Sequence, residues 1–272
     1  PNSGGTVFAS ADAQAVRAAI AAAGAGGTVK IAGYCAGALL DSGTTQVALI
    51  TKTLTLAGGY TTTNWATSYP ITQPTTLDAQ SGGRVLYATQ PLTVSGVTVQ
   101  NGAISGGGPV CPGAGCGGGI YGDSTLALSN VQVLSSTAVH GAGAHSSGSV
   151  TIAGSTFAHN AATGDGGGLR AAGGGSVTGT TFYSNTAGSS GGALFEGPTT
   201  VTNSSFLSNT TGAAGSAGGG YFNGAATLTG VTFTLSVPLT LAMIEGLVLC
   251  CDGQRLVVPL DVVRTLVRPQ RE

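Results

Sequence analysis

The segment GGGLRAAGGGSVTGTTFYSNTAGSS, residues 166–190, is one unit of a repeat of about 25 residues that runs through residues 117–236. Each unit carries three columns of matching side chains. The first column is aliphatic: Leu128, Ile152, Val177, Val201 and Leu228. The second follows five residues later and is mostly aromatic: Val133, Phe157, Phe182, Phe206 and Phe233. The third follows three residues after the second and is polar: Ser136, Asn160, Asn185, Asn209 and Ser236. Three columns held at a fixed period predict stacked copies of one supersecondary unit.

Stacking the units as coils of a parallel β-helix accounts for these columns. Strands of neighbouring coils lie about 4.8 Å apart, so like side chains stack on one another. We expect Asn160, Asn185 and Asn209 to point inward and form a ladder that satisfies buried turn amides. A Gly-rich propeller or sandwich is the alternative, but neither fold holds columns at fixed offsets. We therefore predict an all-β fold, a single-stranded right-handed parallel β-helix.

Each unit also opens with a triplet of small residues, at 117, 141, 166, 191 and 218, which suits tight corners. We expect the residues after the triplets to share a register: Ile120, Ala144, Leu169, Leu194 and Tyr221. One position further on, a predicted outer column stacks polar and aromatic groups along one face, with Glu196 beside it: Tyr121, His145, Arg170, Phe195 and Phe222. Exposed aromatic rings and an arginine on a flat β face suit a sugar or a partner protein. Ordinary surface filling is the alternative interpretation.

The two ends of the chain depart from the repeat. Residues 1–27 are expected to form an N-terminal cap with a capping helix over 10–24, in which Ser10 is the N-cap and Gly24 ends the helix. The β-helix is expected over 28–236, and its irregular early coils are built from runs at 28–34, 47–60, 84–89 and 92–99. Residues 102–118 form a loop insertion between coils. Residues 237–272 form a non-repeat tail.

Composition narrows the classes of function. Charged residues make up 7% of the chain, the net charge is −1, and residues 1–254 hold no cluster of Lys and Arg, which argues against nucleic-acid binding. No apolar run is long enough for a transmembrane segment. Cys111 and Cys116 bracket a Gly/Pro loop that closes as a small disulfide in an oxidising compartment, or else holds two unpaired thiols. No second Cys pair or His cluster has metal-ligand spacing, so we expect no metal and no cofactor.

Two sets of segments place the chain by resemblance. The openings GGGIY, GGGLR and GGALF and the segments STFAHNAA, TTFYSNTA and SSFLSNTT resemble the repeats of bacterial polymorphic outer-membrane proteins. These belong to the pectin-lyase-like right-handed β-helix superfamily, and the resemblance covers about residues 5–233. It implies a secreted or cell-surface bacterial protein whose partner is a surface glycan or protein. Pro1 without a signal peptide is expected either of a mature exported protein or of a fragment.

The tail carries a separate resemblance. Residues 232–269, with PLTLA, EGLVL and GQRLVVPLDVV, resemble the junction between the ATP-binding domain and the SH3-like domain of a chemotaxis histidine kinase. The phosphoacceptor domain and the nucleotide motifs of that family are missing, so kinase activity does not follow. The runs GLVLCC and QRLVVPL, separated by Asp252-Gly253, predict a β-hairpin. One hypothesis is that this hairpin caps the open end of the solenoid; another is that the chain derives from a sensor-kinase fusion.

Catalytic residues are scarce in the repeat. Pectin-lyase-like enzymes use clustered carboxylates, whereas residues 90–235 hold only Asp123, Asp165 and Glu196. Asp123 and Glu196 are expected three coils apart, about 14 Å, which is beyond either glycosidase geometry. His140 and Asp165 precede the Gly triplets of neighbouring coils, so they form either an oriented general base or an ordinary turn pair. We predict a non-catalytic structural or adhesive module, with a carbohydrate-binding or polysaccharide-degrading protein as the alternative.

Overall fold

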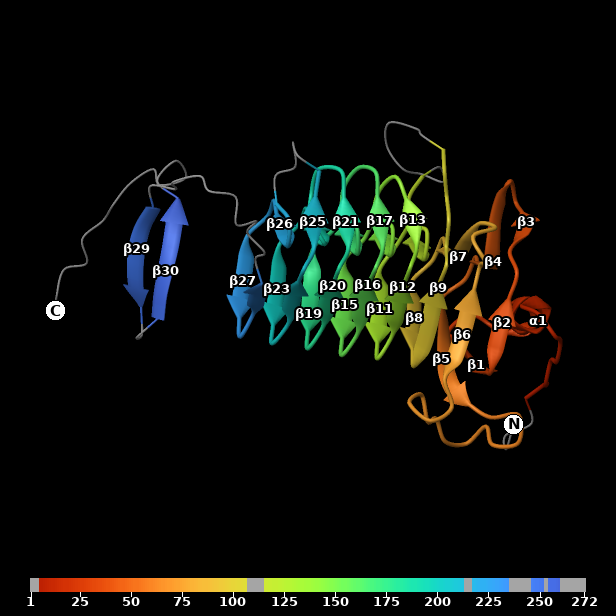
Figure 1. Ribbon diagram of the computed structural model, residues 1–272. Coiled ribbons are helices and arrows are strands. Elements are labelled where there is room, and N and C mark those ends of the chain that lie inside the picture. The colour runs from red at the N-terminus through yellow and green to blue at the C-terminus, as the bar shows by residue number, and fades with distance from the viewer. Residues whose placement is uncertain (1–4, 107–114, 213–216, 235–245, 252–253, 260–272) are drawn as a thin grey trace. The chain divides into compact units, whose positions relative to one another are not determined.

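The structure of the protein is a computed structural model, which describes residues 5–106, 115–212, 217–234, 246–251 and 254–259. The chain divides into two units, residues 1–235 and 236–272. The first unit is a parallel β-solenoid of about eight turns, as the repeat predicts (Figure 1). One strand from each coil joins each of three long sheets, so every strand inside the stack pairs in parallel with the coil before and the coil after it. Sheet C has one further strand, β3, which pairs antiparallel with β4 at the N-terminal end.

Sheet A contains β1 (Gly27–Ala32), β5 (Leu54–Tyr60), β8 (Leu92–Ser95), β11 (Leu126–Ser129), β15 (Val150–Ala153), β19 (Gly175–Thr178), β23 (Thr199–Thr202) and β27 (Ala226–Thr229). Sheet B contains β2 (Tyr34–Ala36), β6 (Thr75–Asp78), β9 (Val97–Gln100), β12 (Gln132–Leu134), β16 (Thr156–Ala158), β20 (Thr181–Tyr183), β24 (Ser205–Leu207) and β28 (Thr232–Thr234). Sheet C contains β3 (Leu39–Asp41), β4 (Thr44–Ile50), β7 (Arg84–Ala88), β10 (Ile120–Gly122), β14 (Ala144–Ser146), β18 (Leu169–Ala171), β22 (Ala193–Phe195) and β26 (Gly220–Phe222). A fourth, short sheet D contains β13 (Thr137–Ala138), β17 (Ala161–Ala162), β21 (Thr186–Ala187) and β25 (Thr210–Thr211).

The core is built from the two apolar columns of the repeat. Phe157, Phe182 and Phe206 pair directly across sheet B, and their rings stack with centroids 5.0 and 4.8 Å apart. All three are buried, as are Val177 and Val201 of the aliphatic column in sheet A. Each coil alone supplies only a few inward side chains, so the stacking of coils is what buries enough apolar surface to hold the fold.

The polar column forms a ladder inside the solenoid. Asn160 and Asn185 are fully buried. The side-chain oxygen of Asn185 accepts hydrogen bonds from the backbone N–H and the side-chain amide of Asn160, at 3.1 and 3.0 Å. Asn209 does the same for Asn185, at 2.9 Å for both bonds. Each side-chain amide also donates to a backbone carbonyl of an earlier coil, such as Phe157 O, so the ladder leaves no amide group of Asn160 or Asn185 without a partner.

The corner between sheets A and B turns on a single residue in the left-handed region. That residue has φ between +49° and +61° in six successive coils and is always glycine or asparagine: Gly96, Asn130, Gly154, Gly179, Asn203 and Gly230. These two residue types tolerate positive φ best. The β-rich runs predicted at 47–60 and 92–99 each contribute strands to two sheets, and the second run is divided by the corner at Gly96.

A short helix, α1 (Gln14–Ala22), covers the N-terminal end of the solenoid, with Val16 and Ile20 buried against the core. It begins later than the predicted 10–24, because residues 11–13 form a bend and a turn: the Asp12 carboxylate accepts from Gln14 N–H, and Ser10 Oγ accepts from Ala15 N–H. The helix ends before Gly24, since Ala23 is already extended at ψ 138°. Ser10 is therefore not adjacent to the helix, although its hydroxyl still satisfies one of the first-turn amides.

The register of sheet C slips by one residue between two coils. The N–H groups of Gly168 and Leu169 both donate to the carbonyl oxygen of Gly192, at 2.7 and 3.2 Å. As a result Leu169 pairs with Ala193, and Ala193 in turn pairs with Gly220. The predicted register of Leu194 and Tyr221 with Leu169 was therefore wrong by one position, because the triplet at 191 includes the alanine that begins the next strand.

Two predicted segments lie partly outside the described residues. Of the insertion predicted at 102–118, residues 107–114 are not described. The strands on either side of it keep the regular stacking, since β9 pairs with β12 of the next coil and β10 pairs with β7 of the coil before. In the second unit, β29 (Gly246–Cys251) and β30 (Gln254–Pro259) pair antiparallel, with Cys251 opposite Gln254. The predicted hairpin pairing is thus confirmed, while its turn at Asp252-Gly253 and the polar column's Ser236 lie outside the described residues.

Candidate functional site

The predicted binding face lies on sheet C. Tyr121, His145 and Arg170 pair directly across β10, β14 and β18, as the repeat predicts. After the register slip the column continues through Leu194 and Tyr221 rather than through Phe195 and Phe222. Phe195 and Phe222 instead face the core, where their rings stack with centroids 5.1 Å apart and Phe195 is fully buried. The inclusion of these two phenylalanines in a binding face was therefore wrong.

The first half of this column is buried, contrary to the expected exposed aromatic face. Tyr121 is 0% exposed and His145 is 4% exposed. The Tyr121 ring stacks on His145 at 5.3 Å and meets Tyr87 edge-on at 5.2 Å. The Arg84 guanidinium lies about 5 Å from the ring centroids of both tyrosines and donates to the carbonyl oxygens of Cys116 and Gly117. The Tyr121 and His145 rings consequently have no free face for a sugar.

Burial also sets the protonation of the column. Desolvation, with nearby Arg170 as a lesser cause, lowers the pKa of His145 to about 3. Desolvation, aided by the Asp123 carboxylate, raises the pKa of Tyr121 to about 12. Both side chains are therefore neutral at pH 7. Within the described structure, Tyr121 Oη, His145 Nδ1 and Arg170 Nε are buried and lack a hydrogen-bond partner, which is costly for groups removed from water.

The second half of the column is more open. Arg170 Nη2 donates to Glu196 Oε1 at 2.8 Å, and the two side chains are 18% and 30% exposed. Glu196 follows β22, so this pair joins two neighbouring coils. Tyr221 on β26 is 36% exposed. Arg170 and Glu196 therefore form the accessible part of the predicted face, and the register slip adds Tyr221 to them.

His140 and Asp165 meet, but not as a catalytic dyad. His140 Nδ1 lies 3.4 Å from the Asp165 carboxylate and accepts a hydrogen bond from the backbone N–H of Asp165 at 3.1 Å. An Nδ1 that accepts a hydrogen bond carries no proton, so the carboxylate cannot orient this ring as it does in a general-base pair. Desolvation and Arg170 lower the pKa of His140, and the Asp165 carboxylate accepts instead from Ser189 Oγ. The contact is that of a turn pair.

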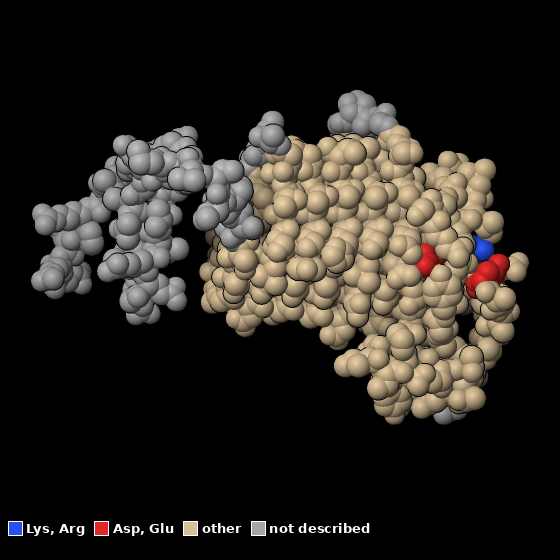
Figure 2. All heavy atoms as spheres, viewed as in Figure 1, with Lys and Arg blue, Asp and Glu red and all other residues tan. Residues whose placement is uncertain are grey.

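The remaining carboxylates are dispersed. Asp123 and Glu196 occupy equivalent positions, since the N–H of each donates to the end of the preceding strand in sheet C, at Ala88 O and Ala171 O. They lie three coils apart, as predicted, which corresponds to about 14 Å of strand spacing. Among the described residues, no group of three or more His, Cys, Asp or Glu side chains could hold a metal ion. The face in Figure 2 is correspondingly almost free of charge, with its few charged atoms near the N-terminal end.

One buried carboxylate was missed by the sequence reasoning. Asp78, 3% exposed, accepts hydrogen bonds from Tyr34 Oη and Gln100 Nε2 at 2.8 Å, from Asn101 Nδ2, and from the N–H of Gln80 at 2.7 Å. Burial alone would raise its pKa, but these donors outweigh burial and lower it. With its oxygens so occupied, Asp78 of β6 links its own coil to the coil before and to the coil after it in sheet B. No repeat column marks this position, because it lies in the irregular early coils.

The cysteines divide by environment. Cys116 is disulfide-bonded, and its predicted partner Cys111 lies outside the described residues. Cys35 is a free thiol in β2, nearly buried, and desolvation raises its pKa. A raised pKa disfavours the thiolate, so Cys35 is not poised as a nucleophile.

Comparisons with known proteins add little to this geometry. No protein-family profile matches the chain, and no solved structure matches it. A curated relative, the chemotaxis protein CheA of Cereibacter sphaeroides, is 46% identical over 41 residues, which is 15% of this chain and 6% of the relative. The match is thus to a small part of a much longer protein. No described helix is both long and apolar enough to cross a bilayer.

Proposed function

We propose that this protein is a non-catalytic structural or adhesive module of a bacterial surface or secreted protein. The observation that carries the proposal is the continuous internal stacking of the coils. Buried Phe and Val columns and the hydrogen-bonded Asn ladder hold the solenoid together from coil to coil. A fold of this kind suits an extended, rigid spacer whose side chains serve packing rather than chemistry.

The arrangement of titratable groups supports the same proposal. Asp123, Asp165 and Glu196 lie on separate coils. The Nδ1 atom of His140 already accepts a hydrogen bond from the Asp165 backbone, so the Asp165 carboxylate does not orient this ring as a base. The stacked Tyr121 and His145 side chains are buried. A polysaccharide lyase or hydrolase requires at least two carboxylates, or a carboxylate and a base, within reach of one glycosidic bond.

Two assays test this proposal on the full chain. The first incubates the purified chain with polygalacturonate and related glycans and measures reducing ends and unsaturated products; we expect none above the heat-unfolded control. The second couples the folded chain to beads and measures retention on bacterial cells under flow. Retention above that of beads carrying heat-unfolded chain supports an adhesive role, whereas glycan cleavage by the folded chain contradicts the proposal.

Carbohydrate binding at the open half of the outer column is the second candidate. It is favoured by the accessible Arg170–Glu196 pair and by the exposed Tyr221 ring in the same column, since planar rings and bidentate charged groups are common in sugar sites. A glycan array probed with the chain and with a Tyr221→Ala variant tests it. Binding of any glycan that is lost in the variant supports this candidate, and an empty array for the unmodified chain removes it.

A further inference from the structure

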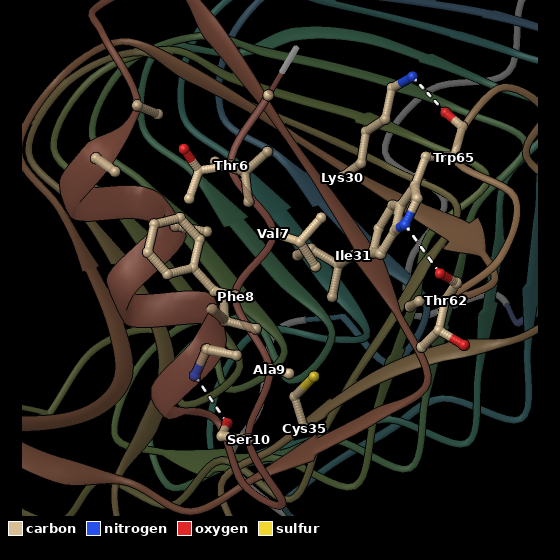
Figure 3. A pocket seen from close by; sticks show the side chains of 18 of the residues that line it. Thr6, Val7, Phe8, Ala9, Ser10, Lys30, Ile31, Cys35, Thr62 and Trp65 are labelled. Atoms are coloured by element: carbon tan, nitrogen blue, oxygen red, sulfur yellow. Dashed lines mark hydrogen bonds between the residues drawn. The ribbon is translucent and has the colours of Figure 1, made fainter. Parts of the chain in front are cut away.

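A cavity of about 560 Å³ lies at the N-terminal end of the solenoid, away from the outer column of sheet C (Figure 3). It is bounded by the extended segment Thr6–Ser10, by α1 and by β1, and Trp65 of the β5–β6 loop stands beside it. The volume falls in the range of small-molecule sites, which is about 300–1,000 Å³. Nothing in the repeat predicts this cavity.

The walls of the cavity are apolar. Val7 and Phe8 line it from the N-terminal segment, and Val29 and Ile31 line it from β1. The helix contributes only small side chains besides Val16, at Ala15, Ala19, Ala22 and Ala23. Because alanine is too short to reach the facing segment, the helix surface leaves space where larger residues would fill it. Cys35 lies deeper in the same space, as a nearly buried neutral thiol.

The polar groups lie at the rim and are of opposite charge. Lys30 Nζ donates to the carbonyl oxygen of Trp65 at 2.6 Å and lies 5.0 Å from the Tyr60 ring centroid. An ammonium group has three donors, so Lys30 keeps capacity for an anion. Asp12 also lines the cavity, and its carboxylate is committed to Gln14 N–H at the start of the helix. An anionic group is therefore attracted to the Lys30 rim and repelled from the Asp12 rim.

We propose that this cavity binds a single-chain amphiphile with an anionic headgroup, such as a fatty acid, with the alkyl chain between α1 and β1 and the headgroup at Lys30. The apolar walls supply the binding energy through the burial of methylene groups of the alkyl chain. The Lys30 ammonium orients the ligand, with its headgroup at the rim, and makes the site prefer an anion. The same chemistry is offered by a free fatty acid and by an acyl chain of an anionic lipid.

The chain has a built-in probe, because Trp65 is its single tryptophan. Dodecanoate, kept below its micellar concentration, is titrated into the full chain while Trp65 emission is followed. We expect a saturable blue shift, because the alkyl chain excludes water beside the indole. As a second readout, alkylation of Cys35 is followed by peptide mass spectrometry, and saturating dodecanoate is expected to slow it at least fivefold. Phosphatidylglycerol vesicles, assayed by co-sedimentation, distinguish a lipid source from a free one.

Two variants and a matched control locate the ligand. Ala19→Leu fills the cavity and is expected to abolish both readouts, while Lys30→Gln weakens dodecanoate binding about two- to fivefold, the size expected of an exposed ion pair. Arg170→Gln removes one positive charge from sheet C, outside the cavity lining, and should leave affinity unchanged. Melting curves of all three variants verify that they are folded. The proposal is overturned if neither dodecanoate nor the vesicles bind, or if dodecyltrimethylammonium binds as tightly as dodecanoate.

Discussion

Two polar columns run along this solenoid, one inside and one outside, and they differ in how their groups are satisfied. The inner column, Asn160, Asn185 and Asn209, uses a side chain that both donates and accepts, so each residue bonds the next and the backbone as well. The outer column begins with Tyr121, His145 and Arg170, and a polar atom of each is buried without a partner in the described structure.

The difference shows what stacking demands of a polar residue. A repeat places equivalent positions of neighbouring coils about 4.8 Å apart, and at this distance one Asn side chain can hydrogen-bond to the Asn side chain of the next coil. A phenol, an imidazole and a guanidinium stack at the same distance, but their hydrogen-bonding atoms do not meet. The inner column should therefore be intolerant of apolar replacement. The outer column should tolerate it or gain from it.

The largest expected effect comes from breaking the inner column at Asn185. Asn185→Leu removes the acceptor of two buried N–H groups of Asn160, one on the backbone and one on the side-chain amide, and it also removes the bonds that the Asn185 amide donates to Phe157 O and Asn209 Oδ1. With about 1–3 kcal/mol for each buried group left unpaired, we expect a loss of about 3–5 kcal/mol in the free energy of unfolding. Urea denaturation measures it. Asn223→Ala, at an exposed position, is the control and should change stability by less than about 0.5 kcal/mol.

The outer column should make the protein sensitive to acid. The pKa of His145 is about 3 in the folded state, against 6.5 for an unperturbed imidazole, so the unfolded chain binds more protons between those values. Stability is therefore constant above about pH 6.5 and falls as the pH drops toward 3, by up to about 1.4 kcal/mol per unit. Between about pH 6.5 and 4.5 we expect a loss of about 2–3 kcal/mol. His140, whose pKa is also lowered, acts in the same direction.

Replacing the imidazole isolates the contribution of His145. A His145→Phe variant keeps the stack on Tyr121 and has no titratable group, so most of the slope between about pH 6.5 and 4.5 should vanish while stability at neutral pH stays equal or rises. Denaturation midpoints of both proteins across this range provide the measurement. An unchanged slope in the variant would show that the acid sensitivity comes from other groups.

The inner and outer columns also differ in how well the sequence predicts them. The inner columns were predictable, because Phe182 and Asn185 recur at fixed offsets and only inward positions demand such identity. The outer column was predictable only as far as Arg170. The shared carbonyl of Gly192 moves the register by one residue, and GGA at 191–193 does not reveal whether its alanine belongs to the corner or to the strand.

Burial of the outer column was less predictable than its register. Alternation places Tyr121 and His145 on the outward side of the strand, and an outward side chain of a solenoid is ordinarily exposed. Their burial depends on residues from other coils, such as Tyr87 and Arg84, whose positions follow from the irregular early coils and not from the repeat. The N-terminal cavity escaped prediction for the same reason, since it exists between segments that have no repeat.

A smaller effect distinguishes the buried phenol of the outer column from an exposed one. Tyr121→Phe removes a hydroxyl that is buried without a partner, so we expect the free energy of unfolding to rise by about 1 kcal/mol. Tyr183→Phe makes the same chemical change at a ring that is 42% exposed and should change stability by less than about 0.5 kcal/mol. Thermal denaturation of the two variants side by side gives the comparison. A loss of stability in Tyr121→Phe that Tyr183→Phe does not share would mean that the Tyr121 hydroxyl is hydrogen-bonded in solution.

The smallest effect is expected where the outer column reaches solvent. Glu196→Gln keeps the shape of the side chain but removes the charge that Arg170 Nη2 contacts at 2.8 Å. Because both side chains are partly exposed, the pair should contribute about 0.2–1 kcal/mol, far less than the inner column. Screening weakens such a pair, so the difference between the variant and the unmodified protein should shrink as NaCl is raised from about 0.05 to about 1 M. A loss above about 2 kcal/mol that salt leaves unchanged would instead place Glu196 among the groups that hold the coils together, and the contrast between the two columns would then fail at this position.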